Sequence, residues 1–162
     1  MVRFSSSFGD FKCAHCLAFV SSSHQLSRVH NRNHCPYCLW SCHLDLYAAG
    51  DRLSACKAGM RPIGLTMKSG RNKYRTESRG ELMLIHECTE CRAISINRIA
   101  ADDDPSNIMA VFQESLAHQH QIKHVCNPLG IFPLNANDVE MIESQLYGQS
   151  TNNPSRIWQF MD

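Results

Sequence analysis

The sequence predicts a small β-rich zinc-ribbon fold, made of two ribbon-like units, with a C-terminal α-helical extension. Three cysteine pairs with C-x-x-C spacing are flanked by short apolar segments, and two stretches with helical periodicity follow them. A chain of 162 residues has room for one domain, or for two small domains that share a core. We expect residues 9–105 to form the ribbon domain and residues 106–162 to form an acidic helical extension.

The cysteines are better explained by metal binding than by disulfides. Nine histidines accompany the nine cysteines, and the N-terminus lacks the apolar segment and cleavage site of a secretory signal. We therefore expect a cytoplasmic protein, and reducing cytosol does not preserve structural disulfides. No apolar run approaches the length needed to cross a bilayer, so no membrane partner is expected.

The first ribbon is predicted from two C-x-x-C turns, which we call knuckles. The segment from Phe11 to Val20 has the pattern of a strand, a C-x-x-C turn and a returning strand. Eighteen residues separate Cys16 from Cys35, which begins the next C-x-x-C. Zinc binds four soft ligands at tetrahedral corners, and two such turns supply all four. A filled site leaves no position for water, so this site is predicted to be structural. Its ligands are Cys13, Cys16, Cys35 and Cys38.

The second ribbon is less complete. Apolar residues at Ile63, Leu65 and Met67 alternate with small or polar ones, which predicts a strand, and the polar, basic residues 68–80 predict a hairpin loop after it. A further strand, knuckle and strand surround Cys88 and Cys91. With Cys56 the second unit has three thiolates, so a fourth ligand must come from elsewhere.

Three residues are candidates for that fourth ligand: His43, His86 and Cys42. His86 shares a strand face with Cys88, which makes tetrahedral closure awkward. His43 lies on a separate segment and can approach from the opposite side, so it is the favoured candidate. The expected cofactor is Zn²⁺, with two ions per chain.

The C-terminal third has helical patterns. The pair Asp104–Pro105 is a favourable helix start, and apolar residues recur at helical spacing from Ile108 to Leu116. A second helix is expected to be capped at Asn137 and to end at Gly148. Its apolar stripe is expected to be part of a core.

The charge is distributed unevenly. Through residue 99 there are fourteen Lys and Arg against seven Asp and Glu, and from residue 100 onward there are two against eight. A basic metal-binding half suggests a polyanion partner. The acidic half is either a self-masking face, a second interaction surface for a protein partner, or the complement of the basic half across an internal interface.

The pentapeptide at residues 32–36, Arg-Asn-His-Cys-Pro, resembles the RNHCP-domain family, which takes its name from it. The resemblance covers roughly residues 9 to 105 and implies a small zinc-ribbon-like domain. Ribbons favour Gly directly after a knuckle, whereas this chain has Leu17, Leu39 and Arg92 there, so we expect a less strained turn. The further matching residues are Trp40, Ser41, His43, Asp45, Gly50, Asp51, Arg52, Cys56, Met60, Pro62, Ile63, Leu84, Ile85, His86, Cys88, Cys91, Asn97, Arg98, Ile99, Ala100, Asp102 and Asp103.

The first functional hypothesis is a non-enzymatic, zinc-binding module that contacts RNA, with the ribosome as one candidate partner. Basic side chains on a rigid ribbon neutralise phosphates, and Tyr37, Trp40 or Tyr74 could stack on unpaired bases. Alternatively, Tyr37 and Trp40 pack against the metal site, and Arg32 and Arg98 bond to nearby aspartates. The candidate RNA-contacting residues are Arg32, Lys68, Arg71, Lys73, Arg75, Arg79 and Arg98.

Two other classes are kept open. A zinc-dependent hydrolase or nuclease would need an open position at the second metal, with carboxylates such as Asp45 or Asp51 directed at it. A protein–protein adaptor would act through the acidic extension and its terminal Trp158 and Phe160. The sequence indicates no catalytic residue, organic cofactor site or small-molecule substrate.

Overall fold

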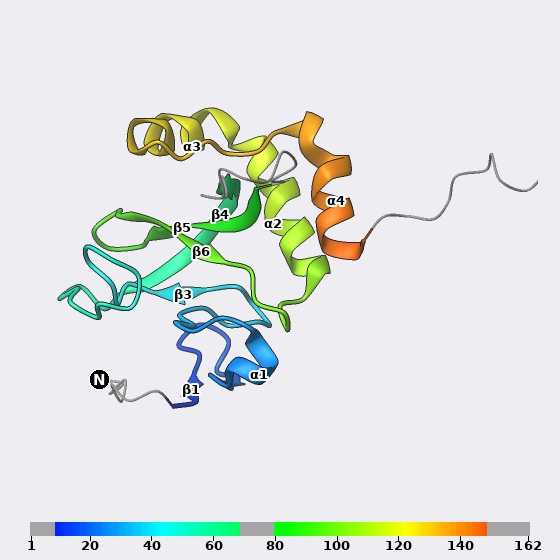
Figure 1. Ribbon diagram of the computed structural model, residues 1–162. Helices are drawn as coiled ribbons and strands as arrows, with labels where there is room; N and C mark the ends of the chain where they lie inside the picture. The colour runs from blue at the N-terminus through cyan, green and yellow to red at the C-terminus, as the bar shows by residue number, and fades with distance from the viewer. Residues whose placement is uncertain (1–8, 69–79, 149–162) are drawn as a thin grey trace, which may run out of the picture.

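A computed structural model of the chain describes residues 9–68 and 80–148 (Figure 1). It contains a two-stranded antiparallel sheet, β1-β2, and a four-stranded antiparallel sheet with the strand order β3-β4-β5-β6. The strands are β1 (Phe11–Lys12), β2 (Phe19–Val20), β3 (Ser41–Cys42), β4 (Gly59–Lys68), β5 (Glu81–Cys88) and β6 (Ile94–Arg98). The helices are α1 (His24–Ser27), α2 (Pro105–Ala117), α3 (Gln119–Cys126) and α4 (Val139–Tyr147), with 3-10 turns η1 (Asn127–Leu129) and η2 (Ala136–Asp138).

The β4–β5 hairpin is the centre of the larger sheet. Its register runs from Met60 opposite Cys88 to Lys68 opposite Glu81, with an irregularity at Ile63. Pro62 precedes this irregularity, in keeping with the confinement of proline to bulges and edges because it has no N–H to donate. From its second residue onward β5 is buried along its whole length, because neighbouring strands flank it and helices cover its face.

The main core joins the sheet to the C-terminal helices. Leu65 and Leu84 of the sheet pack with Ile108 and Phe112 of α2 and with Ile142 of α4, all of them almost fully buried. The described part of the helical extension therefore shares one hydrophobic core with the larger sheet. In Figure 1 the N-terminal unit with β1 and α1 lies at the far side of this sheet from α3.

The helix starts follow the chemistry of their caps. Asp104 accepts a hydrogen bond from the backbone N–H of Ser106 and so caps α2, as the sequence predicts. The expected cap at Asn137 is wrong: Asn135 and Asp138 form a capping box at η2, and α4 continues directly from that turn. Among the described residues no helix combines the length and apolar character needed to cross a membrane.

Candidate metal centres

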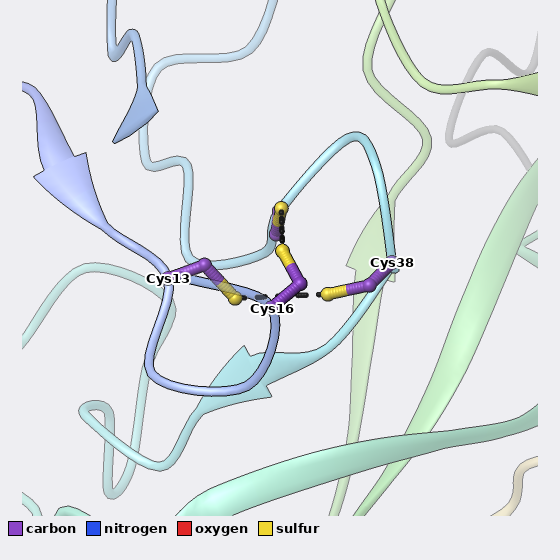
Figure 2. A group of neighbouring side chains, drawn as sticks. Cys13, Cys16 and Cys38 are labelled. Carbon is purple, nitrogen blue, oxygen red and sulfur yellow. Dashed lines mark hydrogen bonds between the residues drawn. The ribbon is translucent and has the colours of Figure 1, made fainter. Parts of the chain in front are cut away.

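Four thiols gather at the junction of the first two knuckles. The sulfurs of Cys13, Cys16, Cys35 and Cys38 all lie within 4.8 Å of one another. Figure 2 shows three of these labelled side chains pointing toward a common centre, and two sulfur pairs lie 3.6 Å apart. A disulfide would bring two sulfurs to about 2.05 Å. Tetrahedral zinc with bonds of about 2.3 Å places sulfurs roughly 3.8 Å apart, so these separations fit a metal site.

The three C-x-x-C turns share one backbone geometry. In each, the N–H of the first cysteine donates to the carbonyl of the residue five positions later, at 2.8–2.9 Å, as Cys35 does to Trp40. The residue after each second cysteine returns its own N–H to the first cysteine's carbonyl and has φ near +60°. Those residues are Leu17, Leu39 and Arg92.

The expected less strained turn is therefore wrong. The two backbone hydrogen bonds that close the knuckle require left-handed backbone after the second cysteine, whatever side chain stands there. Lys57, which follows Cys56, has the same backbone conformation at φ +54°. Each such residue costs on the order of 1 kcal/mol relative to glycine. The knuckles thus hold some strain, which a bound metal would offset.

Burial and backbone amides act in opposite directions on the first cluster. The N–H of Ala18 lowers the pKa of the Cys16 thiol, whereas burial raises the pKa of Cys35 to about 11. Burial also raises the pKa of Cys38. Cys35 and Cys38 are therefore protonated near neutral pH in the absence of a cation. A divalent metal would stabilise all four as thiolates.

A second cluster combines one imidazole with three thiols. The ligand atoms of His43, Cys56, Cys88 and Cys91 lie within 4.8 Å of one another. The sulfurs of Cys56 and Cys88 are 3.6 Å apart, and His43 Nδ1 lies 3.3 Å from the sulfur of Cys91. His43 directly follows β3, Cys56 precedes β4, and the other two flank the β5–β6 turn. Burial raises the pKa of Cys88, but the amides of Cys91 and Glu90 and the neighbouring thiols outweigh it and lower that pKa to about 6.

The other two candidates for the fourth ligand have different partners. His86 is fully buried, with its Nε2 2.7 Å from the carbonyl oxygen of Leu39 and its Nδ1 3.0 Å from the side-chain amide of Asn97. The thiol of Cys42 donates to the carbonyl of Lys57 at 3.3 Å. The structure therefore brings His43, and neither of these residues, together with the three thiols.

The carboxylates named for a hydrolytic site are used elsewhere. Within residues 9–68 and 80–148, no Asp or Glu joins either four-ligand cluster. Asp45 accepts from the backbone N–H groups of Gly50 and Arg52, and Asp51 accepts from four others. The carboxylates of Asp45 and Asp51 thus bond within the loop, and neither is among the candidate metal ligands.

The residues of the Arg-Asn-His-Cys-Pro segment mainly connect parts of the fold. The guanidinium of Arg32 is buried, with ion pairs to Asp102 at 2.7 Å and Asp103 at 3.3 Å. His34 Nε2 lies 2.7 Å from the other oxygen of Asp103, and the side-chain amide of Asn33 donates to Asp45. Arg32 thus serves the fold and offers no charge to a phosphate at the surface. This is the alternative that the sequence left open, in which Arg32 pairs with nearby aspartates, although the sequence did not show which ones.

The other candidate RNA-contacting residues have different settings. Lys68 is exposed at the end of β4, and Arg98 is exposed and pairs with Glu81 at 3.2 Å. Tyr37 is exposed, whereas Trp40 stacks on His15 with ring centroids 4.1 Å apart. The remaining candidates, Arg71, Lys73, Tyr74, Arg75 and Arg79, and the terminal Trp158 and Phe160, lie outside the described residues.

Sequence reasoning missed one buried carboxylate and one loop organiser. Glu87, on β5, is buried and pairs with both Arg61 at 2.8 Å and Arg92 at 2.9 Å. Asp51 organises the segment between β3 and β4, and its place after Gly50 in a polar turn was the available signal. For Glu87 the strand pattern gave no sign, because an acidic residue within a strand is usually assigned to the exposed face.

Comparison with known proteins supports the sequence resemblance. A family model described as RNHCP domain matches residues 8–109. No curated protein and no solved structure gives a match to the chain. The matched range includes every ligand of both clusters and the N-terminal part of α2.

Proposed function

The chain belongs to the RNHCP domain family, and we propose that it is a zinc-binding, non-enzymatic module that contacts RNA. The observation that carries the proposal is the pair of four-ligand clusters, one with four thiols and one with three thiols and an imidazole. Soft sulfur donors in a tetrahedral arrangement favour zinc over magnesium or calcium, which prefer oxygen ligands.

The ligand count supports a structural role for both metals. A catalytic zinc usually has three protein ligands and one open position for water or substrate. Here each cluster supplies four ligands, so the coordination shell is filled by the protein. When bound, zinc would stabilise the thiolates and hold the knuckles closed, which is the chemistry expected of a scaffold.

RNA contact is supported by the distribution of charge. The basic half of the chain includes Lys68 at one end of the β4–β5 hairpin, and the sequence between Lys68 and Glu81 adds Arg71, Lys73, Arg75 and Arg79. By contrast Arg32, Arg61, Arg92 and Arg98 form ion pairs within the fold. Those four arginines are used in ion pairs, whereas the sequence of the hairpin carries five cations that we propose neutralise phosphates.

The metal part of the proposal is tested by elemental analysis. We expect two zinc ions per chain. In His43→Ala we expect the affinity for the second ion, measured by competition with a chelator, to fall at least about tenfold. His86→Gln is the matched control, because its side chain can still bond to Leu39 and Asn97, and it should keep both ions. One ion or none in the unaltered protein would contradict the proposal.

The RNA part is tested by fluorescence anisotropy with a single-stranded oligonucleotide. In the variant Lys73→Glu with Arg75→Glu, affinity should fall and the slope of log affinity against log salt should decrease by about 1.4, or about 0.7 per phosphate contact. The variant Lys12→Glu with Lys123→Glu, altered on β1 and α3, is the matched control and should leave the slope unchanged. An unaltered chain that binds no RNA would refute this part.

A further inference from the structure

The loop between β3 and β4 is closed at both ends by the second cluster. His43 and Cys56 flank residues 44–55, and both belong to the group of four ligands. Figure 1 shows this loop in cyan beside the β5–β6 turn, which carries Cys88 and Cys91. A metal bound there would connect the two ends of the loop to the sheet. We call residues 44–57, which include the ligand Cys56 and the Lys57 that follows it, the stapled loop.

Inside the loop, one carboxylate fixes the backbone. Asp51 accepts hydrogen bonds at 2.8–3.0 Å from the N–H groups of Leu46, Tyr47, Ala48 and Leu53. These amides, with that of Leu53 foremost, hold the pKa of Asp51 well below its usual range. Asp45 adds bonds from Gly50 and Arg52. The loop therefore keeps one shape without a hydrophobic core of its own.

That fixed backbone presents apolar side chains to solvent. Leu46 is 50% exposed, Leu53 is 62% exposed and the ring of Tyr47 is 85% exposed. Three large side chains exposed on one ordered loop make this loop a candidate interaction site. Because the backbone is already ordered, a partner would pay little conformational entropy to bind there.

The charges of the stapled loop decide which partner fits. Asp45 and Asp51 accept hydrogen bonds from backbone amides of the loop, and Asp45 also lies 3.9 Å from Nε of Arg52. The side chains of Arg52 and Lys57 are nevertheless exposed. The ammonium of Lys57 donates to the backbone carbonyl of Arg52. An exposed aromatic ring and exposed cations on one loop are the combination used to stack unpaired bases and neutralise the adjoining phosphates.

We propose that the stapled loop is a single-stranded RNA contact, in which a base stacks on Tyr47 while Arg52 and Lys57 face the neighbouring phosphates. This inference rests on the proposed RNA-binding function and adds a second surface to it. The ten residues of β4 separate the stapled loop from Lys68, which corresponds to about 30 Å. A strand of RNA contacting both surfaces would therefore run along the sheet.

The second metal then has a role beyond stability. Loss of that ion would release both ends of the stapled loop, although the first cluster would stay intact. Loss of the second metal should accordingly reduce RNA affinity more than it disrupts the overall fold. His43→Cys, which retains a soft ligand, should preserve the loop, whereas His43→Ala should release it.

The test compares variants of the zinc-loaded full chain in binding an oligouridine of about 16 nucleotides at several salt concentrations. Tyr47→Ala should weaken binding by roughly 5- to 150-fold without changing the salt slope, because stacking is not ionic. Tyr47→Phe should restore binding, since the ring is what stacks. Tyr147→Ala, a similarly exposed tyrosine on α4, is the matched control and should bind like the unaltered chain.

The outcomes separate this inference from the proposed function. If the unaltered chain binds no RNA, the proposed function fails and this inference fails with it. If it binds RNA and Tyr47→Ala binds equally well, only the stapled-loop inference is overturned, and the exposed ring would be left for a protein partner. A reduced affinity in Tyr47→Ala that Tyr47→Phe does not restore would also overturn it. Equal binding by His43→Ala and His43→Cys would overturn the role of the second metal.

Discussion

Replacing Asp103 with asparagine is expected to destabilise the protein strongly, although the residue contacts no metal. Its carboxylate is fully buried and accepts from Arg32 at 3.3 Å, from the N–H of Ala100 at 2.7 Å, and lies 2.7 Å from His34 Nε2. This carboxylate links the segment before Cys35 to the segment that leads into α2. Asparagine has nearly the same volume, so the change removes charge without opening a cavity.

The magnitude follows from the bonds that lose their charge. Two of the three contacts are with basic side chains, and a hydrogen bond to a charged group contributes roughly 1.5–3 kcal/mol. Breaking a buried ion pair on one side costs about 3–5 kcal/mol, because the remaining charge stays buried. We therefore expect Asp103→Asn to lower the free energy of unfolding by about 3–5 kcal/mol. Asp102, whose side chain is 33% exposed and makes one such contact, should contribute only about 1 kcal/mol.

Urea unfolding at saturating zinc and neutral pH measures both variants. Circular dichroism reports the sheet, and an unchanged m-value would show that the unfolding transition is still the same one. The reasoning is refuted if Asp103→Asn loses no more stability than Asp102→Asn. That result would mean that the buried pair contributes nothing beyond what its desolvation costs.

Three further predictions concern the knuckles, a buried histidine and the helices. Leu17→Gly should be neutral or stabilising by up to about 1 kcal/mol, because Leu17 is exposed at φ +65°. Leu39→Gly, at the same knuckle position, should lose about 2–4 kcal/mol because Leu39 is buried. The urea midpoints of the two variants test this difference. Burial lowers the pKa of His86 from 6.5 to about 3, so the unfolded chain binds a proton between these values that the folded chain does not. As the pH decreases below 6.5, the free energy of unfolding should therefore decrease by up to about 1.4 kcal/mol per pH unit. His86→Gln should lack this pH-dependent loss in urea titrations at pH 7 and 5.5. Phe112→Ala on α2 should cost about 3–5 kcal/mol and shift sheet unfolding with it; a sheet that unfolds at an unchanged midpoint would contradict a shared core.

The metal clusters were the most predictable part of the molecule, for a physical reason. Ligand spacing within a C-x-x-C turn is set by local backbone geometry, so the short pairs indicate a site without knowledge of the fold. The fold class and the family resemblance are confirmed for the same reason, since both depend on those local motifs. The choice among His43, His86 and Cys42 depended on strand geometry, which indicates the facing of a side chain and so disfavoured His86.

Long-range pairing was beyond the reach of the sequence. Arg32 and Asp103 are 71 positions apart, and nothing local distinguishes Asp103 from the other aspartates near it. The helical periodicity of α2 predicted the helix and its apolar face, but it did not predict that Leu65 and Leu84 would be the surface it covers. The left-handed backbone at Leu17 and Leu39 was missed because propensity favours glycine there, and two hydrogen bonds per turn override that propensity.

The positions of the two clusters along the chain imply an order of assembly. The first cluster spans 25 residues from Cys13 to Cys38, whereas the second reaches 48 residues from His43 to Cys91. Loop length alone makes little difference, because doubling it adds only about 0.6 kcal/mol of closure entropy. The larger barrier is that Cys56 and Cys88 flank opposite strands of the β4–β5 hairpin, so that hairpin must pair before they meet. A nascent chain would thus bind its first ion early and its second only once the sheet has formed. Binding of the second zinc would therefore be a late step of folding.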